Sequence, residues 1–340
     1  MPERSSAAPA SPRRGSRCEP RHLRLCRHIT QAPQPLAGTV SYSVNRIWDA
    51  RRVSNDADFT EPRRITFRGH GGIALAGESW GPADGPLAVF LHGGGQTRHS
   101  WKESGAALAK VGMHAVLLDA RGHGESDWAP DGDYSRTAMT ADLLDILAEL
   151  DRPAIVVGAS MGGLTALLAT ARPGRERIAG LVLVDVVPRP EHKGVERVMN
   201  FLGGHPEGFA SLEEAADAVA EYLPHRRRPR NPEGLRRNLR LREDGRWYWH
   251  WDPAMMSSRP EDIELQTSDL EDAARALEIP VLLVRGRLSD VVSEQGVADF
   301  RALVPQMEYV EITGAAHTAA SDVNDEFSDA VVDFVRAHLS

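Results

Sequence analysis

The chain has 340 residues, which is enough for one large α/β domain with an inserted subdomain or for two small domains. Its hydrophobic fraction of 41% and charged fraction of 26% are ordinary for a globular protein. The net charge of −8 argues against non-specific nucleic-acid binding by the whole chain. No apolar run approaches the roughly 20 residues that span a bilayer, so we expect no membrane partner. The only cysteines, Cys18 and Cys26, leave the rest of the chain without a disulfide or a cysteine nucleophile, which fits a cytoplasmic location.

Residues 1–60 are rich in Arg, Pro, Ser and Ala and show no sustained hydrophobic period. We therefore predict a disordered Arg/Pro-rich N-terminal segment. Two alternatives stay open for this segment. It has the Arg-rich, acid-poor composition of a transit peptide, and it also fits an upstream stretch included by a start codon placed too early.

From Arg64 onward the sequence alternates between predicted strands and predicted helices. Short apolar stretches on both sides of Gly71-Gly72 predict an antiparallel hairpin. Continuous apolar runs, which are typical of buried parallel strands, follow at 86–91, 114–119, 154–157, 178–187, 280–284 and 307–312. The sequence therefore predicts an α/β fold with a mostly parallel eight-stranded sheet and helices on both of its faces.

Residues 188–262 interrupt this alternation. A capping box at Ser211-Leu212-Glu213-Glu214 favours a helix start within them. We expect residues 61–187 and 263–340 to form the core, and residues 188–262 to form a helical lid inserted after the sixth strand.

Two segments of the expected lid have two interpretations each. The aromatic segment Trp247-Tyr248-Trp249-His250-Trp251 is either a hydrophobic anchor of the lid or a wall of an apolar pocket. The basic run 225–230, together with Arg236, Arg237, Arg240 and Arg242, is interpreted as a solvated face, with attraction of carboxylate-bearing substrates as the alternative.

A candidate catalytic turn lies at Gly158-Ala159-Ser160-Met161-Gly162. An apolar run precedes it and an apolar helix start follows it, which gives the order strand, sharp turn, helix. A serine at such a turn exposes its hydroxyl above the sheet, and the small residues are needed because the turn has no room for a Cβ atom. Ser160 is therefore the candidate nucleophile, and a simple strand–turn–helix crossover is the alternative.

Five short motifs of polar and glycine residues each lie at the end of a predicted strand. They are His92-Gly93-Gly94-Gly95, Asp119-x-Arg121-Gly122-His123-Gly124-x-Ser126, Gly158-x-Ser160-x-Gly162, Gly286-x-x-x-Asp290 and Gly314-x-x-His317. Together they resemble the motifs of the α/β-hydrolase superfamily over roughly residues 64–340. The chain looks like the lidded branch, which contains esterases, haloperoxidase-like perhydrolases, C–C bond hydrolases and epoxide hydrolases.

The resemblance implies a catalytic triad of serine, acid and histidine in that order. Ser160 is expected to attack an acyl carbon, His317 to act as its base, and Asp290 to hold the imidazole. Asp185, at the end of the sixth strand, is the alternative acid, because some relatives of this fold place it there. A serine in place of an aspartate nucleophile argues against opening of epoxides or halides.

The oxyanion hole is expected to use two backbone N–H groups. Met161 supplies one because it opens the helix after Ser160, and Gly94 is expected to supply the second, with Gly95 as the next candidate. His92 and His123 are expected to brace the surrounding loops, since no short-spaced ligand set suggests a metal.

The sequence thus predicts a cofactor-free serine hydrolase that cleaves a carboxylic ester or similar small-molecule acyl substrate through an acyl-enzyme. Perhydrolase, haloperoxidase-like or C–C bond hydrolase activity and a ligand-binding receptor are the alternatives. By chain position alone, Trp101, Trp249, Trp251 and Leu288 are candidates to line the substrate pocket. The oligomeric state stays open.

Overall fold

The computed structural model describes residues 61–340 apart from 225–227, 229, 258–260, 318–323 and 340. The predicted disorder of residues 1–60 and both cysteines lie outside these residues. Within the described part of the chain, no helix is long and apolar enough to cross a membrane.

The described strands of the core form one eight-stranded sheet in the order β1-β2-β4-β3-β5-β6-β9-β10. The strand β2 is antiparallel to both of its neighbours, and all pairs from β4 to β10 are parallel. This confirms the predicted fold class, including the hairpin around Gly71-Gly72. The bounds are β1 Arg63–Arg68, β2 Ala74–Trp80, β3 Leu87–Leu91, β4 His114–Leu118, β5 Ala154–Ala159, β6 Ile178–Val184, β9 Val281–Gly286 and β10 Glu308–Ile312.

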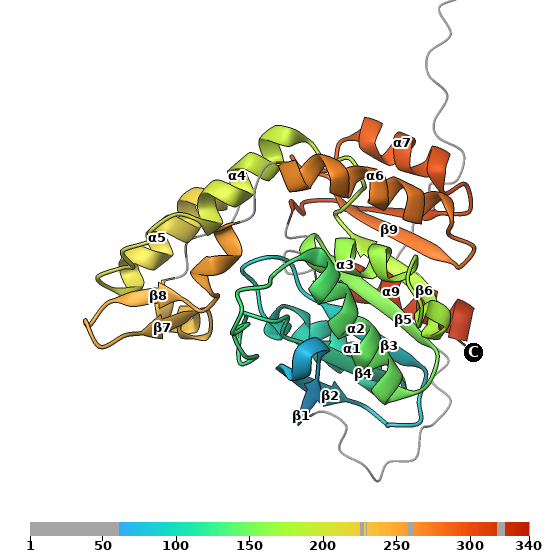
Figure 1. Ribbon diagram of the computed structural model, residues 1–340, viewed down its shortest axis with the longest axis horizontal. Coiled ribbons are helices and arrows are strands. Elements are labelled where there is room, and N and C mark those ends of the chain that lie inside the picture. The colour runs from blue at the N-terminus through green and yellow to red at the C-terminus, as the bar shows by residue number, and fades with distance from the viewer. Residues whose placement is uncertain (1–60, 225–227, 229, 258–260, 318–323, 340) are drawn as a thin grey trace, which may run out of the picture. The chain divides into compact units, whose positions relative to one another are not determined.

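Helices cover both faces of this sheet (Figure 1). One layer contains α1 (Lys102–Lys110) and α9 (Asn324–Leu339), which pack against each other. The other layer contains α2 (Arg136–Leu150), α3 (Met161–Ala169), α6 (Glu261–Arg275) and α7 (Glu294–Leu303).

The two layers explain why the central strands are apolar without interruption. On β5, Ile155 and Val157 join the apolar cluster under α1 and α9, whereas Ala154 and Val156 join the cluster under α2 and α3. Successive side chains of a strand point to opposite faces, so a strand covered on both sides needs apolar residues at every position. Polar residues therefore occur at the ends of these central strands.

Between β6 and α6 the chain forms a segment that we call the insertion, residues 188–257. It contains α4 (His192–Leu202), α5 (Leu212–Tyr222) and an antiparallel pair, β7 (Leu239–Leu241) and β8 (Trp247–Trp249). Figure 1 shows α5, β7 and β8 grouped beside the core, with α4 leading to them. The expected helix start is present, since the Ser211 hydroxyl accepts a hydrogen bond from the Glu214 N–H.

The segment expected to be helical contains a pair of strands besides its helices. The aromatic run Trp247–Trp249 forms a strand, and a turn with Gly245 at φ +76° joins it to β7. Aromatic side chains fit the pleated surface of a strand well, and glycine adopts positive φ without strain. Trp249 packs with Phe209 and Leu212 in an apolar cluster that belongs to the insertion.

Candidate active site

Ser160 occupies a sharp turn between β5 and α3. Its backbone has φ +45° and ψ −112°, a conformation that few residues other than glycine adopt. A Cβ atom at Gly158 would lie 2.5 Å from the Gly162 carbonyl oxygen, and one at Gly162 would lie 2.5 Å from the Leu91 carbonyl oxygen. The small residues of the motif are therefore required by the close approach of α3 to β5 and β3. Backbone strain of this kind is concentrated at functional sites.

His317 lies beyond β10, and its ring is fixed by a carboxylate from another strand end. The Nδ1 atom of His317 is 2.8 Å from Oδ2 of Asp185, which follows β6. Asp185 is wholly buried, and it also accepts hydrogen bonds from the Gly286 N–H (3.1 Å) and the Ser289 hydroxyl (2.6 Å). Three donors thus hold this carboxylate in one orientation.

Asp290, which the sequence favoured as the partner of His317, is engaged elsewhere. Arg197 of α4 donates from Nε to Oδ2 at 2.7 Å and from Nη2 to Oδ1 at 2.8 Å. These hydrogen bonds to Arg197 are the main cause that lowers the pKa of Asp290. The Asp290 side chain is 44% exposed. The structure therefore pairs the imidazole with the alternative carboxylate, because a cation from the insertion already satisfies Asp290.

The hydrogen bonds of the loop after β3 distinguish between the two glycine candidates for the oxyanion hole. The Gly95 N–H donates to Nε2 of His123 at 3.2 Å, so it is already used. The Gly93 carbonyl accepts from Nδ1 of His92 at 2.8 Å, and a planar trans peptide then aims the Gly94 N–H in the opposite direction. Among the described residues, nothing accepts a hydrogen bond from the Gly94 N–H. The geometry favours Gly94 over Gly95.

The other expected donor and the nucleophile lie beside this loop. Met161 is the first residue of α3, and the N–H groups of a first helical turn have no partner within the helix. A Cβ atom at Gly93 would lie 3.5 Å from Cβ of Ser160. The glycine loop, Ser160 and the start of α3 therefore meet at the carboxyl ends of β3 and β5.

The insertion packs directly on the glycine loop. A Cβ atom at Gly95 would come within 2.4 Å of Leu202 Cδ2 and 3.1 Å of Trp251 Cζ3, and one at Gly94 would lie 3.3 Å from Leu202 Cδ1. Gly95 has φ +72°. The loop thus needs glycine both for its backbone and for its contact with the insertion.

Three buried histidines surround the same loop: His92, His123 and His250. Their rings are in contact, with centroids 4.9 Å apart for the first pair and 5.8 Å apart for the second. Burial is the main cause that lowers the pKa of each, to about 3 for His250. No set of three metal-ligating side chains is arranged for an ion in the described residues.

The four expected pocket residues have different surroundings. Trp101 is fully buried between Phe90 and Phe327 under α1 and α9, so its assignment to the pocket is not supported. Trp249 and Trp251 stack on each other with centroids 4.9 Å apart, and Trp251 reaches the glycine loop. Leu288 is exposed at 56%.

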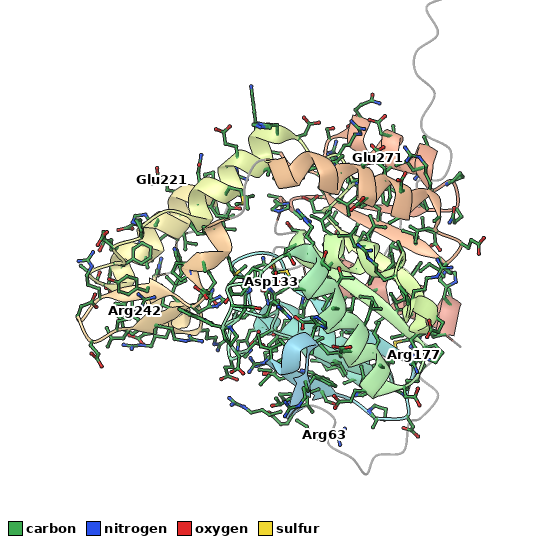
Figure 2. All side chains as sticks on the ribbon, in the orientation of Figure 1. Arg63, Asp133, Arg177, Glu221, Arg242 and Glu271 are labelled. Carbon is green, nitrogen blue, oxygen red and sulfur yellow. The ribbon has the colours of Figure 1, made fainter. Side chains whose placement is uncertain are left out.

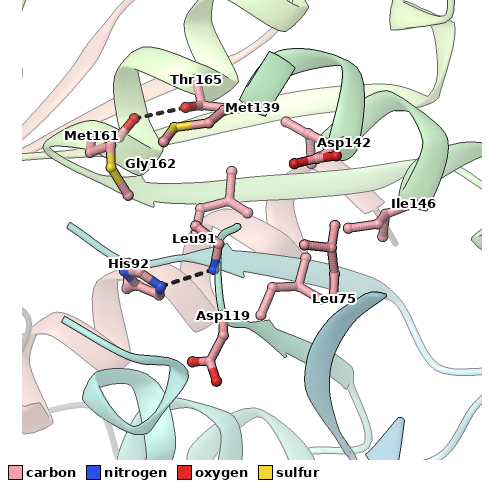
Figure 3. Close-up of a pocket in the computed structure, with 13 residues that line it drawn as sticks. Leu75, Leu91, His92, Asp119, Met139, Asp142, Ile146, Met161, Gly162 and Thr165 are labelled. Atoms are coloured by element: carbon pink, nitrogen blue, oxygen red, sulfur yellow. Dashed lines mark hydrogen bonds between the residues drawn. The ribbon is translucent and has the colours of Figure 1, made fainter. Parts of the chain in front are cut away.

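A small cavity lies between the start of α3, helix α2 and the ends of β3 and β4 (Figure 3). Its volume is about 40 Å³, enough for water but not for an ester. The lining is mostly apolar and includes Leu91 of β3, Met161 and Gly162 of α3, and Met139 of α2. We therefore assign it to the packing behind the turn and not to the substrate.

Among the described arginines of the basic run, Arg236 and Arg242 have partners on the surface, whereas Arg240 donates to the Gly124 carbonyl at 2.6 Å. Residues 225–227 and 229 lie outside the described part. Arg236 pairs with Glu233 and lies over the Trp247 ring at 4.8 Å. Arg242 lies over the Tyr248 ring at 3.9 Å, and Figure 2 shows it at the end of the insertion that carries β7 and β8. For Arg236 and Arg242 this is the arrangement that a solvated face would have.

Sequence reasoning missed three contributors to the site. Ser289 was passed over in favour of its neighbour Asp290, and Arg197 carried no signal within α4. His250 was hidden among the tryptophans of the aromatic segment. The one signal for His250 in the sequence was its position as a polar residue among large aromatic residues, which are usually buried.

Comparisons with known proteins agree with the observed fold. The family model for the alpha/beta hydrolase fold matches residues 86–322. Esterase Rv0045c of Mycobacterium tuberculosis is 33% identical over 261 residues, which cover 73% of this chain and 82% of that protein. The sn-1-specific diacylglycerol lipase ABHD11 of Mus musculus is 29% identical over 272 residues, which cover 75% of this chain and 82% of that protein.

A solved structure of the M. tuberculosis esterase superposes with a TM-score of 0.62 at 29% identity, over 84% of this chain and 93% of that chain. The strained serine turn, the sheet order and the extent of these matches lead to one assignment. The chain belongs to the α/β-hydrolase family.

Proposed function

We propose that the chain is a serine hydrolase that cleaves a carboxylic ester or similar acyl substrate through an acyl-enzyme. One observation carries the proposal. His317 is bonded through Nδ1 to a wholly buried carboxylate, Asp185, while Ser160 occupies a strained turn at a neighbouring strand end. Two relatives that bear the names esterase and diacylglycerol lipase support an ester as the substrate class.

The tautomer of His317 fits the role of a general base. A carboxylate accepts hydrogen bonds and does not donate them, so the His317 proton lies on Nδ1 and Nε2 keeps its lone pair. That lone pair would take the Ser160 proton as Oγ attacks the acyl carbon, and Asp185 would stabilise the imidazolium that forms. In the described residues no hydrogen bond yet joins Ser160 to His317. Such bonds often tighten only when substrate binds.

The tetrahedral oxyanion would be held by the N–H groups of Gly94 and Met161. Neither has another role in the described structure, and the start of α3 adds the positive end of the helix dipole. His317 would then donate its proton to the leaving alcohol. A water molecule that His317 activates would attack the acyl-enzyme in the same geometry and release the acid.

The proposal includes a covering role for the insertion. Leu202 and Trp251 contact the glycine loop from the insertion, so they would form the apolar boundary of the acyl site next to the oxyanion. Burial of apolar substrate surface against such residues is the common source of affinity in ligand pockets.

The test compares wild type with Ser160→Ala on short and medium p-nitrophenyl esters, with fluorophosphonate labelling of both proteins. We expect wild type to turn over and to take one label at Ser160. The alanine variant should show neither, with a loss of activity of about 10³-fold or more. Labelling or turnover that survives in Ser160→Ala would overturn the proposal.

A further inference from the structure

His250 connects the insertion to the loop that we assign to the oxyanion hole. It follows β8, and its ring is buried at 1% exposure. Nδ1 accepts a hydrogen bond from the Gly124 N–H at 2.8 Å, so the ring proton must lie on Nε2. From Nε2 the ring donates to the Gly95 carbonyl at 3.3 Å.

His123 holds the same glycine from the other side. The Gly95 N–H donates to Nε2 of His123 at 3.2 Å, and Nδ1 of His123 donates to the Arg121 carbonyl at 3.1 Å. Both polar backbone groups of Gly95 are thus fixed by histidines, one from the core and one from the insertion. Each ring has its tautomer set by backbone partners.

These bonds hold the two peptide planes that follow the Gly94 N–H. The peptide between Gly94 and Gly95 is a rigid plane, and the bond from its N–H to His123 fixes that plane. The preceding plane is fixed by the bond from His92 to the Gly93 carbonyl. Three successive glycines have the largest backbone freedom of any sequence, so without these partners the Gly94 N–H would sample many directions.

The segment that carries His250 is itself tied to the core. The Asp252 N–H donates to the Gly122 carbonyl at 3.0 Å, and the Tyr134 hydroxyl donates to Asp252 Oδ2 at 2.6 Å. Arg240 donates to the Gly124 carbonyl at 2.6 Å. This part of the insertion is therefore held against the loop after β4 by bonds on both sides of His250.

We propose that His250 is a positioning residue through which the insertion orients the oxyanion hole. The inference rests on the proposed serine-hydrolase function. In this arrangement the insertion does more than cover the site, because its hydrogen bond to the Gly95 carbonyl fixes the peptide plane after Gly95. Loss of that bond would let the glycine loop that carries the Gly94 N–H shift. Loss of an oxyanion donor lowers kcat by about 10²–10³-fold, and partial misplacement lowers it by less.

The two ring nitrogens of His250 have different partners, so substitutions can remove either hydrogen bond or both. His250→Asn keeps an acceptor near the Nδ1 position for Gly124 but loses the donor to Gly95. His250→Gln places an amide N–H near the Nε2 position and keeps that donor. His250→Phe keeps the ring and loses both bonds. His205→Asn is the control, because His205 is another histidine of the insertion and its ring lies against that of Phe209, with centroids 4.5 Å apart.

Stopped-flow measurement of the acylation rate and of ester binding separates positioning from structure. We expect His250→Asn and His250→Phe to lower the acylation rate about 10- to 100-fold with ester affinity changed less than threefold. His250→Gln should recover most of the rate, and His205→Asn should keep it. The inhibition constant of a trifluoromethyl ketone, which forms a tetrahedral oxyanion on Ser160, should rise by the same factor as the acylation rate falls.

Two results would overturn the inference. One is an acylation rate within twofold of wild type in folded His250→Asn and His250→Phe. The other is a loss of rate in all three variants, His250→Gln included, with unchanged ketone inhibition, which would indicate a purely structural role. In either case Ser160→Ala distinguishes the two proposals. If Ser160→Ala abolishes acylation while the His250 variants retain it, only the positioning role fails.

Discussion

Asp185 and Asp290 occupy similar places, each in a loop after one of two neighbouring parallel strands, yet their surroundings are opposite. Asp185 is wholly buried and accepts hydrogen bonds from His317, Ser289 and the Gly286 N–H. Asp290 is 44% exposed and is bound by Arg197 of the insertion. Chain position therefore does not decide which carboxylate serves the histidine. The choice between the two carboxylates depends on burial and on the hydrogen-bond donors that surround each of them.

The largest expected effect comes from replacing each carboxylate by its amide. Asp185→Asn should lower kcat/KM by about 10³–10⁴-fold, because an amide can donate to His317 and so favours the wrong tautomer. Asp290→Asn should lower it by less than about fivefold, since its main partner is Arg197. Steady-state kinetics on one p-nitrophenyl ester measures both. Equal losses, or a larger loss in Asp290→Asn, would reverse the assignment.

A smaller effect is expected from Ser289, which holds Asp185 from the loop after β9. Ser289→Ala should lower kcat about tenfold, because a hydrogen bond to a charged group contributes roughly 1.5–3 kcal/mol and only part of it acts in the rate-limiting step. Ser293→Ala is the matched control, since Ser293 only caps α7. It should lower the free energy of unfolding by about 1 kcal/mol and leave kcat unchanged. A normal rate in Ser289→Ala would show that this bond does not orient Asp185.

The buried histidines predict how stability depends on pH. Burial lowers the pKa of His114 to about 4 and that of His250 to about 3, from an ordinary value of 6.5. Between pH 6.5 and about 5 the unfolded chain then binds more protons than the folded chain, so stability falls as the pH is lowered. Urea unfolding of Ser160→Ala at pH 7.5, 6.5, 5.75 and 5 should show a midpoint that decreases over this range. A constant midpoint would contradict it.

The smallest effect concerns the Arg197–Asp290 pair. Both side chains are partly exposed, at 39% and 44%, so solvent screening limits their coupling. A double-mutant cycle with Arg197→Ala and Asp290→Ala should give a coupling free energy of unfolding of about 0.5–1 kcal/mol that decreases with added salt. A coupling of several kcal/mol would mean that this pair, and not the bonds around His250, is the main attachment of the insertion.

The sequence was sufficient for the parts of the molecule that local chemistry determines. Uninterrupted apolar runs predicted the buried parallel strands, and small residues around Ser160 predicted the strained turn, because each pattern follows from the steric needs of its own segment. The expected position of His317 beyond the last strand also agrees with the structure, although its catalytic role stays a prediction.

The sequence was insufficient where partners come from distant segments. The competition between Asp185 and Asp290 is decided by Arg197, which lies 93 positions before Asp290. The contact of His250 with Gly95 spans 155 positions. Trp101 was expected in the pocket by chain position alone, but it is buried between the sheet and the α1–α9 layer, with Phe90 and Phe327. Spacing within a segment does not specify such long-range contacts.

The most direct test of the account is the low-field proton NMR spectrum of His317. A proton on Nδ1 that is shared with a buried carboxylate gives a strongly deshielded resonance, and the structure assigns this bond to Asp185. The account predicts that wild type and Asp290→Asn show the resonance and that Asp185→Asn and His317→Gln lack it. A resonance that survives in Asp185→Asn and is lost in Asp290→Asn would contradict the account.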